Sequence, residues 1–335
     1  LQVIYVPVFR FDQILPWWRV PYAFPNSTLI TPFADPDRAT HYEASVGGEL
    51  LSFLTFRATY YGKSLRNQLQ LGRVYSRTTD QALFVSLLNS GAGTVRGFET
   101  EIQMRIGEAI TVSGSYGLTD ARGRSSHPRS NAYAVTDDLR PSYYPEVAVP
   151  LDYAIDHKVV LLGSLQAPAS EVGILGGAGL TVLLTYSTGH PYSRFAPVRI
   201  SGAASPWNIG VRSLIDPRAA DPIEPENSSR TPGVLNVDIH LRKSFSVGGI
   251  TTTIHADILN VFNVKSVLNV YPNSGLPNND SWFESPFSSF FKETDGYEDF
   301  YNTINLRNRW HYMSATGNDI YGTPRQIRLG LRVDL

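Results

Sequence analysis

Two histidines and two aspartates come closest to forming a chemical site in this sequence. His240 and His255 lie on the polar faces of two neighbouring predicted strands, and Asp238 and Asp257 lie beside them. Imidazole and carboxylate groups placed together could bind a metal ion or relay a proton. Hydrogen bonding along a polar strand face is the simpler interpretation of the same residues, and it is the one we favour. We therefore predict neither a resident metal nor a cofactor.

Sequence motifs give no support for an enzyme. The 335 residues contain no G-x-S-x-G, H-E-x-x-H, phosphate-binding loop or dinucleotide fingerprint. Cysteine is absent, which excludes disulfides, thiolate metal ligands and a cysteine nucleophile. The net charge of −1 gives no electrostatic case for a nucleic-acid partner.

One segment, residues 264–324, combines many aromatic side chains with charges of both signs. Because disordered loops are poor in aromatic residues, we expect this one to fold. A surface of this composition suits ligand capture, and packing of the loop on itself is the competing interpretation. Asp295, Glu298 and Asp299 lack the spacing of an EF-hand calcium loop. The candidates for ligand contact are Trp282, Phe283, Phe287, Tyr297, Tyr301, Arg307, Arg309 and Trp310.

The elements that must position these residues have a period of two. The last eleven residues read RQIRLGLRVDL, in which every second residue from Ile327 to Leu335 is apolar. Such alternation predicts a strand with one apolar and one polar face. Similar segments recur at 3–9, 42–50, 54–61, 98–106, 110–118, 157–166, 180–187, 235–245 and 250–262, which gives about ten antiparallel strands.

The connections between these strands alternate between short turns and long segments. The long ones are 12–40, 66–94, 120–150, 194–232 and 264–324. No apolar run reaches the ~18 residues of a membrane-spanning helix, so a membrane location would require a closed barrel. Short turns on one side and long loops on the other are typical of bacterial outer-membrane barrels. Tyr60, Tyr116 and Tyr186 lie about seven residues into their strands, where such barrels carry an aromatic girdle.

The polar strand faces carry charges of both signs, which a water-filled or plugged lumen tolerates better than a soluble core does. The predicted residues of this face are Arg57, Glu99, Glu101, Arg105, His240, Arg242, His255, Asp257, Arg328 and Arg332. Both contact with a plug and a purely structural role in the wall are consistent with their positions.

Five segments, taken together and in order, resemble the C-terminal half of TonB-dependent outer-membrane receptors. They are NSTLITPFADPDRATHYEASVG from Asn26, VRGFETEIQMR from Val95, LTYSTGHPYSR from Leu184, NVDIHLRKSFSVGGITTTIHADILNVFN from Asn236, and the closing PRQIRLGLRVDL. Two departures are Phe33, where the family has Glu, and the terminal Leu335, where it has Phe or Trp. The sequence starts without Met or a signal peptide, and we take it to be a fragment or a mature chain.

The resemblance implies a fold, a location and a set of partners. Residues 1–335 would be the C-terminal portion of a 22-stranded transmembrane barrel, with the plug domain and the N-terminal barrel strands outside this sequence. The implied partners are outer-membrane lipid, the plug of the same protein, the TonB complex and a small-molecule nutrient such as a ferric siderophore. The implied location is the outer membrane of a Gram-negative bacterium.

Three other interpretations stay open at this point. A complete ten-stranded barrel could act as a passive pore or an adhesin. A barrel enzyme would need a cluster of acid, base and nucleophile at strand ends, which the sequence does not offer convincingly. A soluble β-sandwich would have to place five long loops on one side.

Overall fold

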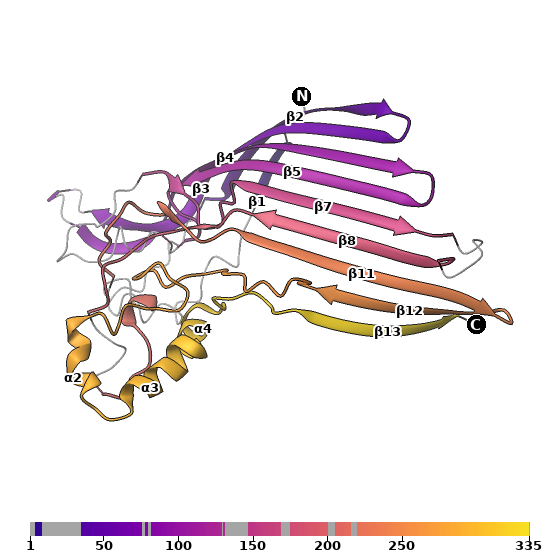
Figure 1. The fold of residues 1–335 in the computed structure, drawn as a ribbon. Helices are drawn as coiled ribbons and strands as arrows, with labels where there is room; N and C mark the ends of the chain where they lie inside the picture. The colour runs from indigo at the N-terminus through magenta and orange to yellow at the C-terminus, as the bar shows by residue number, and fades with distance from the viewer. Residues whose placement is uncertain are drawn as a thin grey trace.

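A single large antiparallel sheet organises the chain in the computed structural model, which describes residues 4–8, 35–75, 78–79, 82–128, 130, 147–168, 175–199, 205–215 and 220–334. Ten strands are paired in the order β1-β2-β3-β4-β5-β7-β8-β11-β12-β13, and β6 pairs with β5 as an eleventh. Neighbours in sequence are therefore neighbours in the sheet (Figure 1). The predicted antiparallel sheet of about ten strands is confirmed. Within the described residues the sheet is open, with β1 and β13 at its two ends.

The strands are β1 (Ile4–Val8), β2 (Asp37–Leu51), β3 (Leu54–Tyr75), β4 (Ala82–Ile106), β5 (Ile110–Gly123), β6 (Val149–Pro150), β7 (His157–Gln166), β8 (Ala178–Ser187), β9 (Pro191–Tyr192), β10 (Ser229–Arg230), β11 (Val234–Val247), β12 (Ile250–Leu259) and β13 (Gln326–Asp334). The helical turns are η3 (Arg212–Leu214), η5 (Pro286–Ser288), α2 (Ser289–Lys292), α3 (Tyr297–Tyr301), the π-helical η6 (Asn302–Arg307) and α4 (Trp310–Thr316). No helix among the described residues is long and apolar enough to cross a membrane.

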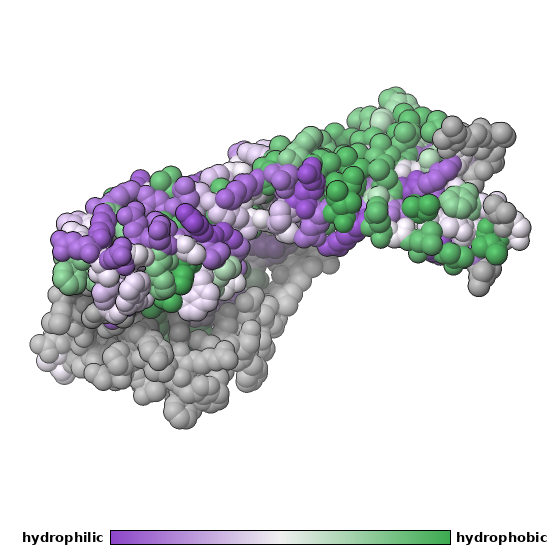
Figure 2. Space-filling model, turned by 60° about the horizontal axis from the view of Figure 1, so that its bottom comes forward, coloured by the Kyte–Doolittle hydropathy of each residue, from purple (hydrophilic) through white to green (hydrophobic). Residues whose placement is uncertain are grey.

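One face of the sheet, which we call the apolar face, exposes large hydrophobic side chains from most strands. Residues opposite one another in the pairing share a face, and the row Phe56, Ile102, Gly114 and Leu161 runs across four strands. Exposure is high, reaching 53% at Ile102 and 79% at Leu329. Figure 2 shows hydrophobic residues gathered over the strands, while hydrophilic residues dominate the loop end. Soluble proteins rarely expose so extended an apolar surface, whereas strands facing lipid require it.

The other members of this face include Val46, Tyr60, Phe98, Val112, Leu118, Tyr186, Leu235, Leu241, Ile254, Ile327, Leu331 and Val333. Tyr60, Tyr116 and Tyr186, the predicted girdle residues, all lie on it. The opposite side, which we call the polar face, carries the alternating residues of the same strands.

The two ends of the sheet differ, as the sequence predicted. At one end the strands of β2–β3, β4–β5 and β11–β12 are joined by short turns, and positive φ angles at Gly107, Gly248 and Gly249 allow two of them. At the other end lie the described parts of the long connections, with the helices α2, α3 and α4 (Figure 1). β13 ends at the short-turn end.

One predicted loop is wrong. Residues 66–94 form no long loop, because β3 and β4 continue as a paired hairpin as far as the partners Tyr75 and Ala82. Register shifts after Arg66 and Gln68 bend this extension. Backbone hydrogen bonds between strands also form in water, so a strand need not stop where its alternation of hydrophobicity stops. Most of the predicted loop 12–40 lies outside the described residues.

The exit from the β11–β12 hairpin is fixed by an asparagine, as the sequence suggested. Asn260 adopts a positive φ of 51°, its Nδ2 donates to the carbonyl of Val264 at 2.9 Å, and its Oδ1 accepts from the Val264 N–H at 2.9 Å. Asp238 on β11 accepts the Asn260 N–H at 2.8 Å. A second asparagine, Asn263, accepts the N–H of Arg325 at 3.0 Å and so ties this exit to the start of β13. The largest loop of the molecule therefore begins and ends at one rigid point.

The two faces of β4 allow a direct test of which one meets lipid. We expect Ile102→Arg to lower the free energy of unfolding in lipid vesicles by about 2–4 kcal/mol, because it places a guanidinium in hydrocarbon. Gln103→Arg, the adjacent residue on the polar face, should change it by less than about 1 kcal/mol. Denaturant titrations in phosphatidylcholine vesicles measure both. Equal losses for the two variants would contradict the assignment of the faces.

Candidate functional site

The ten residues predicted for the lumen side all lie on the polar face. Arg57 stands opposite Glu101, and Asp257 stands opposite Arg328, each on a neighbouring strand. This face is hollowed by two wide concavities of about 930 and 920 Å³, both lined in part by Arg57 and Glu101. Opposite charges at paired positions stabilise a sheet modestly and leave hydrated groups available to a partner. The remaining members are Glu99, Arg105, His240, Arg242, His255 and Arg332.

The two histidines and their neighbouring aspartate lie together on the polar face. Nδ1 of His240 bonds to the carboxylate of Asp257, and the rings of His240 and His255 lie 6.1 Å apart. The His255 ring covers Gly330 on β13, where any larger side chain would collide with it. In the described part of the chain, no group of three His, Cys, Asp or Glu side chains is arranged to hold a metal ion.

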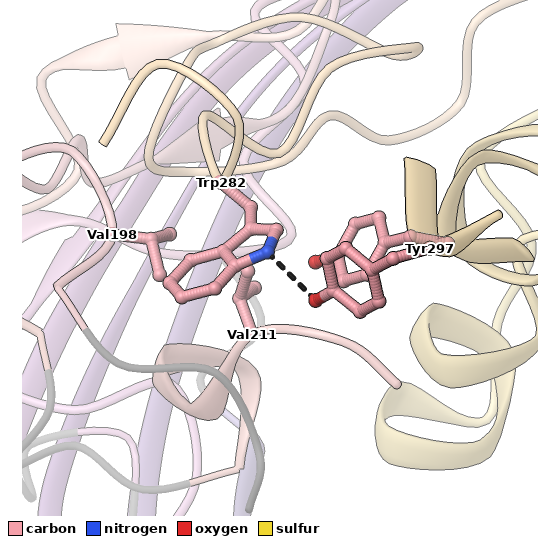
Figure 3. Packing of buried hydrophobic residues seen from close by; sticks show 5 residues of the cluster. Val198, Val211, Trp282 and Tyr297 are labelled. Atoms are coloured by element: carbon pink, nitrogen blue, oxygen red, sulfur yellow. Dashed lines mark hydrogen bonds between the residues drawn. The ribbon is translucent and has the colours of Figure 1, made fainter. Parts of the chain in front are cut away.

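At the loop end, two long connections fold together into one unit, which we call the cap. The cap comprises the described parts of residues 188–233 and 260–325. Val198 and Val211 of the first connection pack against Trp282, Tyr297 and Tyr301 of the second (Figure 3). All five side chains are buried. The Nε1–H of Trp282 donates to the hydroxyl of Tyr297 at 3.0 Å. The cap therefore has its own hydrophobic core.

Backbone and side-chain hydrogen bonds join the same two connections. The Val198 N–H donates to Ser281 Oγ at 3.0 Å, and the Ser213 hydroxyl donates to Asn273 Oδ1 at 2.6 Å. Asn273 Nδ2 in turn donates to the carbonyl of Ala196 at 2.7 Å. Because these groups are buried or half-buried, each would cost free energy if left unpaired. Each connection therefore supplies hydrogen-bond partners that polar groups of the other connection need.

A buried carboxyl lies at the centre of the cap. Asp280 is 1% exposed, and it accepts hydrogen bonds from the Tyr301 hydroxyl at 2.7 Å and from the Trp282 N–H at 3.0 Å. Burial raises the pKa of Asp280, and these hydrogen bonds partly offset the effect. Burial and the neighbouring Asp280 raise the pKa of the Tyr301 hydroxyl well above its usual range. The pair organises the loop rather than offering a reactive group to a ligand.

The second half of the cap is held by an arginine. Nε and Nη2 of Arg309 donate to the two carboxylate oxygens of Asp319 at 2.6 and 3.1 Å, and the guanidinium lies 5.1 Å from the centre of the Tyr321 ring. The bond from Arg309 holds the pKa of Asp319 below its usual range. Such a bidentate pair fixes the start of α4, which carries Trp310.

The structure corrects part of the predicted ligand-contact set. Trp282, Tyr297 and Tyr301 are at most 1% exposed, so their rings form the cap core and present no surface to a ligand. Phe283 packs against the same core, and Arg309 is engaged by Asp319. Packing of the loop on itself, the competing interpretation, accounts for these five residues.

Three of the predicted residues stay accessible. Phe287 and Trp310 are 55% and 51% exposed, and Arg307 is also exposed. Two further aromatic residues join them: Phe290 at 69% and Trp207 at 52%. Trp207 lies on the first connection and contacts Phe300 edge-on at 5.4 Å between ring centres. Nothing marked Trp207 in the sequence beyond its being an aromatic residue in a polar segment.

A titratable contact also joins the cap to the β5–β7 connection. Burial and the nearby charge of Asp152 raise the pKa of Glu226 to about 7. Asn227, which follows it, donates to Asp152 Oδ1 at 2.7 Å and to the Pro150 carbonyl at 2.8 Å. Two carboxyl groups thus approach each other where two connections meet.

Replacing Tyr301 by Phe tests the central role of Asp280. We expect the local unfolding free energy of the cap to fall by about 1–3 kcal/mol, because a buried carboxyl loses a hydrogen-bond donor. Tyr297→Phe removes only a neutral acceptor and should cost less. Hydrogen exchange of the amides in α3 and η6 measures both changes. A Tyr297→Phe variant as destabilised as Tyr301→Phe would contradict the assignment.

The contact at Glu226 should depend on pH. Since its folded pKa of about 7 lies above the ordinary value of 4.5, stability from the protonated form is complete below about 4.5 and is lost as pH rises through about 7. Hydrogen exchange near Asn227 should therefore quicken over that range, and Glu226→Gln should flatten the dependence. Glu293→Gln at an exposed cap position is the control. An unchanged pH profile in Glu226→Gln would refute this role.

Comparisons with known proteins give matches among solved structures alone. No family model matches the chain, and no curated protein matches it. FpvA of P. aeruginosa bound to a heterologous pyoverdine and iron matches with a TM-score of 0.48 and 14% identity, over 89% of this chain and 27% of FpvA. The outer membrane transporter YddB of Escherichia coli matches with a TM-score of 0.47 and 13% identity, over 70% of this chain and 30% of YddB.

The FrpB iron transporter of Neisseria meningitidis matches with a TM-score of 0.46 and 14% identity, over 89% of this chain and 31% of FrpB. The chain thus spans about a quarter to a third of the length of these proteins. The solved structures that this chain matches are TonB-dependent outer-membrane receptors, the family that its sequence motifs resemble, and the match is to part of their barrel.

Proposed function

We propose that this chain is the C-terminal part of the barrel of a TonB-dependent outer-membrane receptor, which takes up a scarce nutrient such as a ferric siderophore. The observation that carries the proposal is the sheet itself. It exposes an apolar face, backs that face with charges of both signs, and places every described long connection at one end. This combination suits a barrel wall with lipid on one side and a wet, occupied lumen on the other.

The cap supplies the capture surface in this proposal. The core of the cap is packed around Trp282. Three aromatic rings and one guanidinium are exposed on its surface: Phe287, Phe290, Trp310 and Arg307. Because that core holds the backbone in place, binding would have to order few residues, which favours affinity. Aromatic rings and an arginine are the side chains that most often dominate binding energy.

The polar face supplies the contact with the plug. Four charged side chains on that face are partly or fully exposed. Arg57 and Glu101 line one of its concavities, and Asp257 stands opposite Arg328 on the neighbouring strand. Contacts between hydrated charges are individually weak, so a plug held by them could be shifted by an external force without unfolding the wall. No chemical change in the nutrient is required, which agrees with the absence of catalytic motifs in the sequence.

Uptake by cells tests the capture surface. We expect Phe287→Ala combined with Trp310→Ala to raise the half-saturating concentration for uptake of an iron-loaded siderophore roughly tenfold or more, because two exposed rings are lost. Met313→Ala, on the same helix as Trp310, should leave uptake close to normal. Radiolabelled iron uptake by a strain expressing each variant measures the effect. Normal uptake by the double variant would refute the role of the cap.

The same assay separates a receptor from a passive pore. Uptake through a TonB-dependent receptor requires inner-membrane energy, so we expect a protonophore to abolish it. Uptake that persists in the presence of the protonophore, and that scales linearly with nutrient concentration, would favour the pore.

A further inference from the structure

Three hollows follow one another along the polar face of the sheet. The hollow at the loop end, which we call the outer hollow, has a volume of about 320 Å³, and Asp37, Gln68 and Ser126 are among its lining residues. The next is the concavity of about 920 Å³ described above, which we call the middle hollow, and the last is the concavity of about 930 Å³. The polar face therefore carries a series of hollows that begins at the loop end.

The outer and middle hollows meet at a narrow junction. The two wide concavities adjoin over a boundary formed by four strands, with Arg57 and Glu101 among the shared lining residues. By contrast, within the described part of the chain the outer and middle hollows share only Leu65 of β3 and Tyr153 of the β5–β7 connection. We call Leu65 and Tyr153 the neck.

The neck differs in chemistry from the hollows on either side of it. Leu65 and Tyr153 contribute an aliphatic side chain and an aromatic ring. The outer hollow has polar side chains such as Ser125, and the middle hollow has charged ones such as Lys63 and Glu99. An apolar constriction between polar compartments opposes the passage of hydrated solutes, because their polar groups lose hydrogen bonds with water there.

Tyr153 stands at the tip of a turn that is anchored on the sheet. The Ala154 N–H donates to the Leu151 carbonyl at 2.8 Å, so Asp152 and Tyr153 are the central residues of a β-turn. Leu151 and Ala154 are buried and pack with Ala121 of β5, whereas Tyr153 is 55% exposed. The two buried residues hold the turn on the polar face, and the ring of Tyr153 lines both hollows.

The cap holds the same turn from its other side. Asn227 donates through Nδ2 to Asp152 Oδ1 at 2.7 Å, and Arg230 donates through Nη1 to the Ala154 carbonyl at 3.2 Å. Nη2 of Arg230 also donates to Asp156 Oδ1 at 2.7 Å, and a hydrogen bond between two charged groups is stronger than one between neutral groups. The position of the ring at the neck therefore depends on the cap as well as on the sheet.

We propose that Tyr153 selects solutes by size where they pass from the loop end into the middle hollow. The inference rests on the proposed function, which makes the polar face the route of the nutrient. The ring narrows this route because the sheet and the cap both hold its backbone. A slim or flexible solute passes between Leu65 and Tyr153, whereas a bulky, rigid one stops in the outer hollow.

Labelling of single thiols in intact cells tests the neck. Because the sequence contains no cysteine, Gln68→Cys introduces one thiol in the outer hollow and Lys63→Cys introduces one in the middle hollow. Each change is made in the natural full-length protein, and the protein without it gives the background. The reagent is a maleimide carrying a chain too bulky for the general pores of the outer membrane, so it approaches only from outside the cell.

We expect the bulky maleimide to label Gln68→Cys at least roughly tenfold faster than Lys63→Cys, since the neck excludes it. Tyr153→Ala should raise the rate at Lys63→Cys roughly tenfold, and Tyr153→Phe should leave it low because the ring is kept. Ile155→Ala, which changes a residue that lines the middle hollow but not the outer one, is the matched control and should leave the rate low. Normal labelling of Gln68→Cys in each variant shows that the protein still folds.

A further variant tests the part played by the cap. We expect Arg230→Gln to raise the rate at Lys63→Cys by less than Tyr153→Ala does, because the turn is loosened while the ring remains. Arg199→Gln removes a different arginine–aspartate pair of the cap, the one formed with Asp221 at 3.3 Å, and should leave the rate low. An unchanged rate in Arg230→Gln would contradict the role of the cap in placing the ring.

Two results would overturn the proposal and leave the proposed function standing. Equal labelling of Gln68→Cys and Lys63→Cys before any other change would show that nothing narrows the route at this level. A low rate at Lys63→Cys that Tyr153→Ala does not raise would show that another part of the protein blocks the route. A different result, labelling of Gln68→Cys only after the membrane is disrupted, would contradict the proposed function itself, because the loop end would not face the outside of the cell.

Discussion

The fold depends on one constraint, the register of antiparallel pairing from β2 to β13. Because side chains alternate between faces, a slip of one residue moves a whole strand's side chains to the other face. In β13 such a slip would put Arg328 and Arg332 where Leu329 and Leu331 now lie, among exposed hydrophobic neighbours such as Ile254. In a membrane, the setting of the proposed function, placing two guanidinium groups against hydrocarbon would cost free energy, which favours the observed register. This register also decides which side chains lie on the apolar face and which lie on the polar face.

The cap is a consequence of the same pairing. Its two connections leave from β8 and β12, which flank β11 in the sheet, so their starting points are held a fixed distance apart. Asn260 and Asn263 then direct the second connection out of the sheet and return it to β13. Val198 and Trp282 can meet only because the sheet keeps these stems together. The cap core contains little regular structure, since its helical turns are three to seven residues long.

Alternation in the sequence was enough to predict the strands and the side on which each residue lies. It failed at residues 66–94, where pairing continues although the hydrophobic pattern has stopped, because backbone hydrogen bonds hold a strand regardless of its side chains. Aromatic content predicted that residues 264–324 fold, but not which rings are inside. Helices this short show no periodicity in the sequence. Trp282 packs against Val198 and Val211, and these two valines come from a connection about 80 residues earlier in the sequence.

The continuation of β3 and β4 beyond the hydrophobic part also changes how their charged residues are understood. In a loop, Arg66 would be a solvated side chain without a defined direction. In a paired strand, the register that puts Ile102 on the apolar face puts Arg96 on the same face, three alternations higher. Nothing in the strand pairing itself requires Arg38 to stand opposite Arg66, because like charges at paired positions disfavour each other.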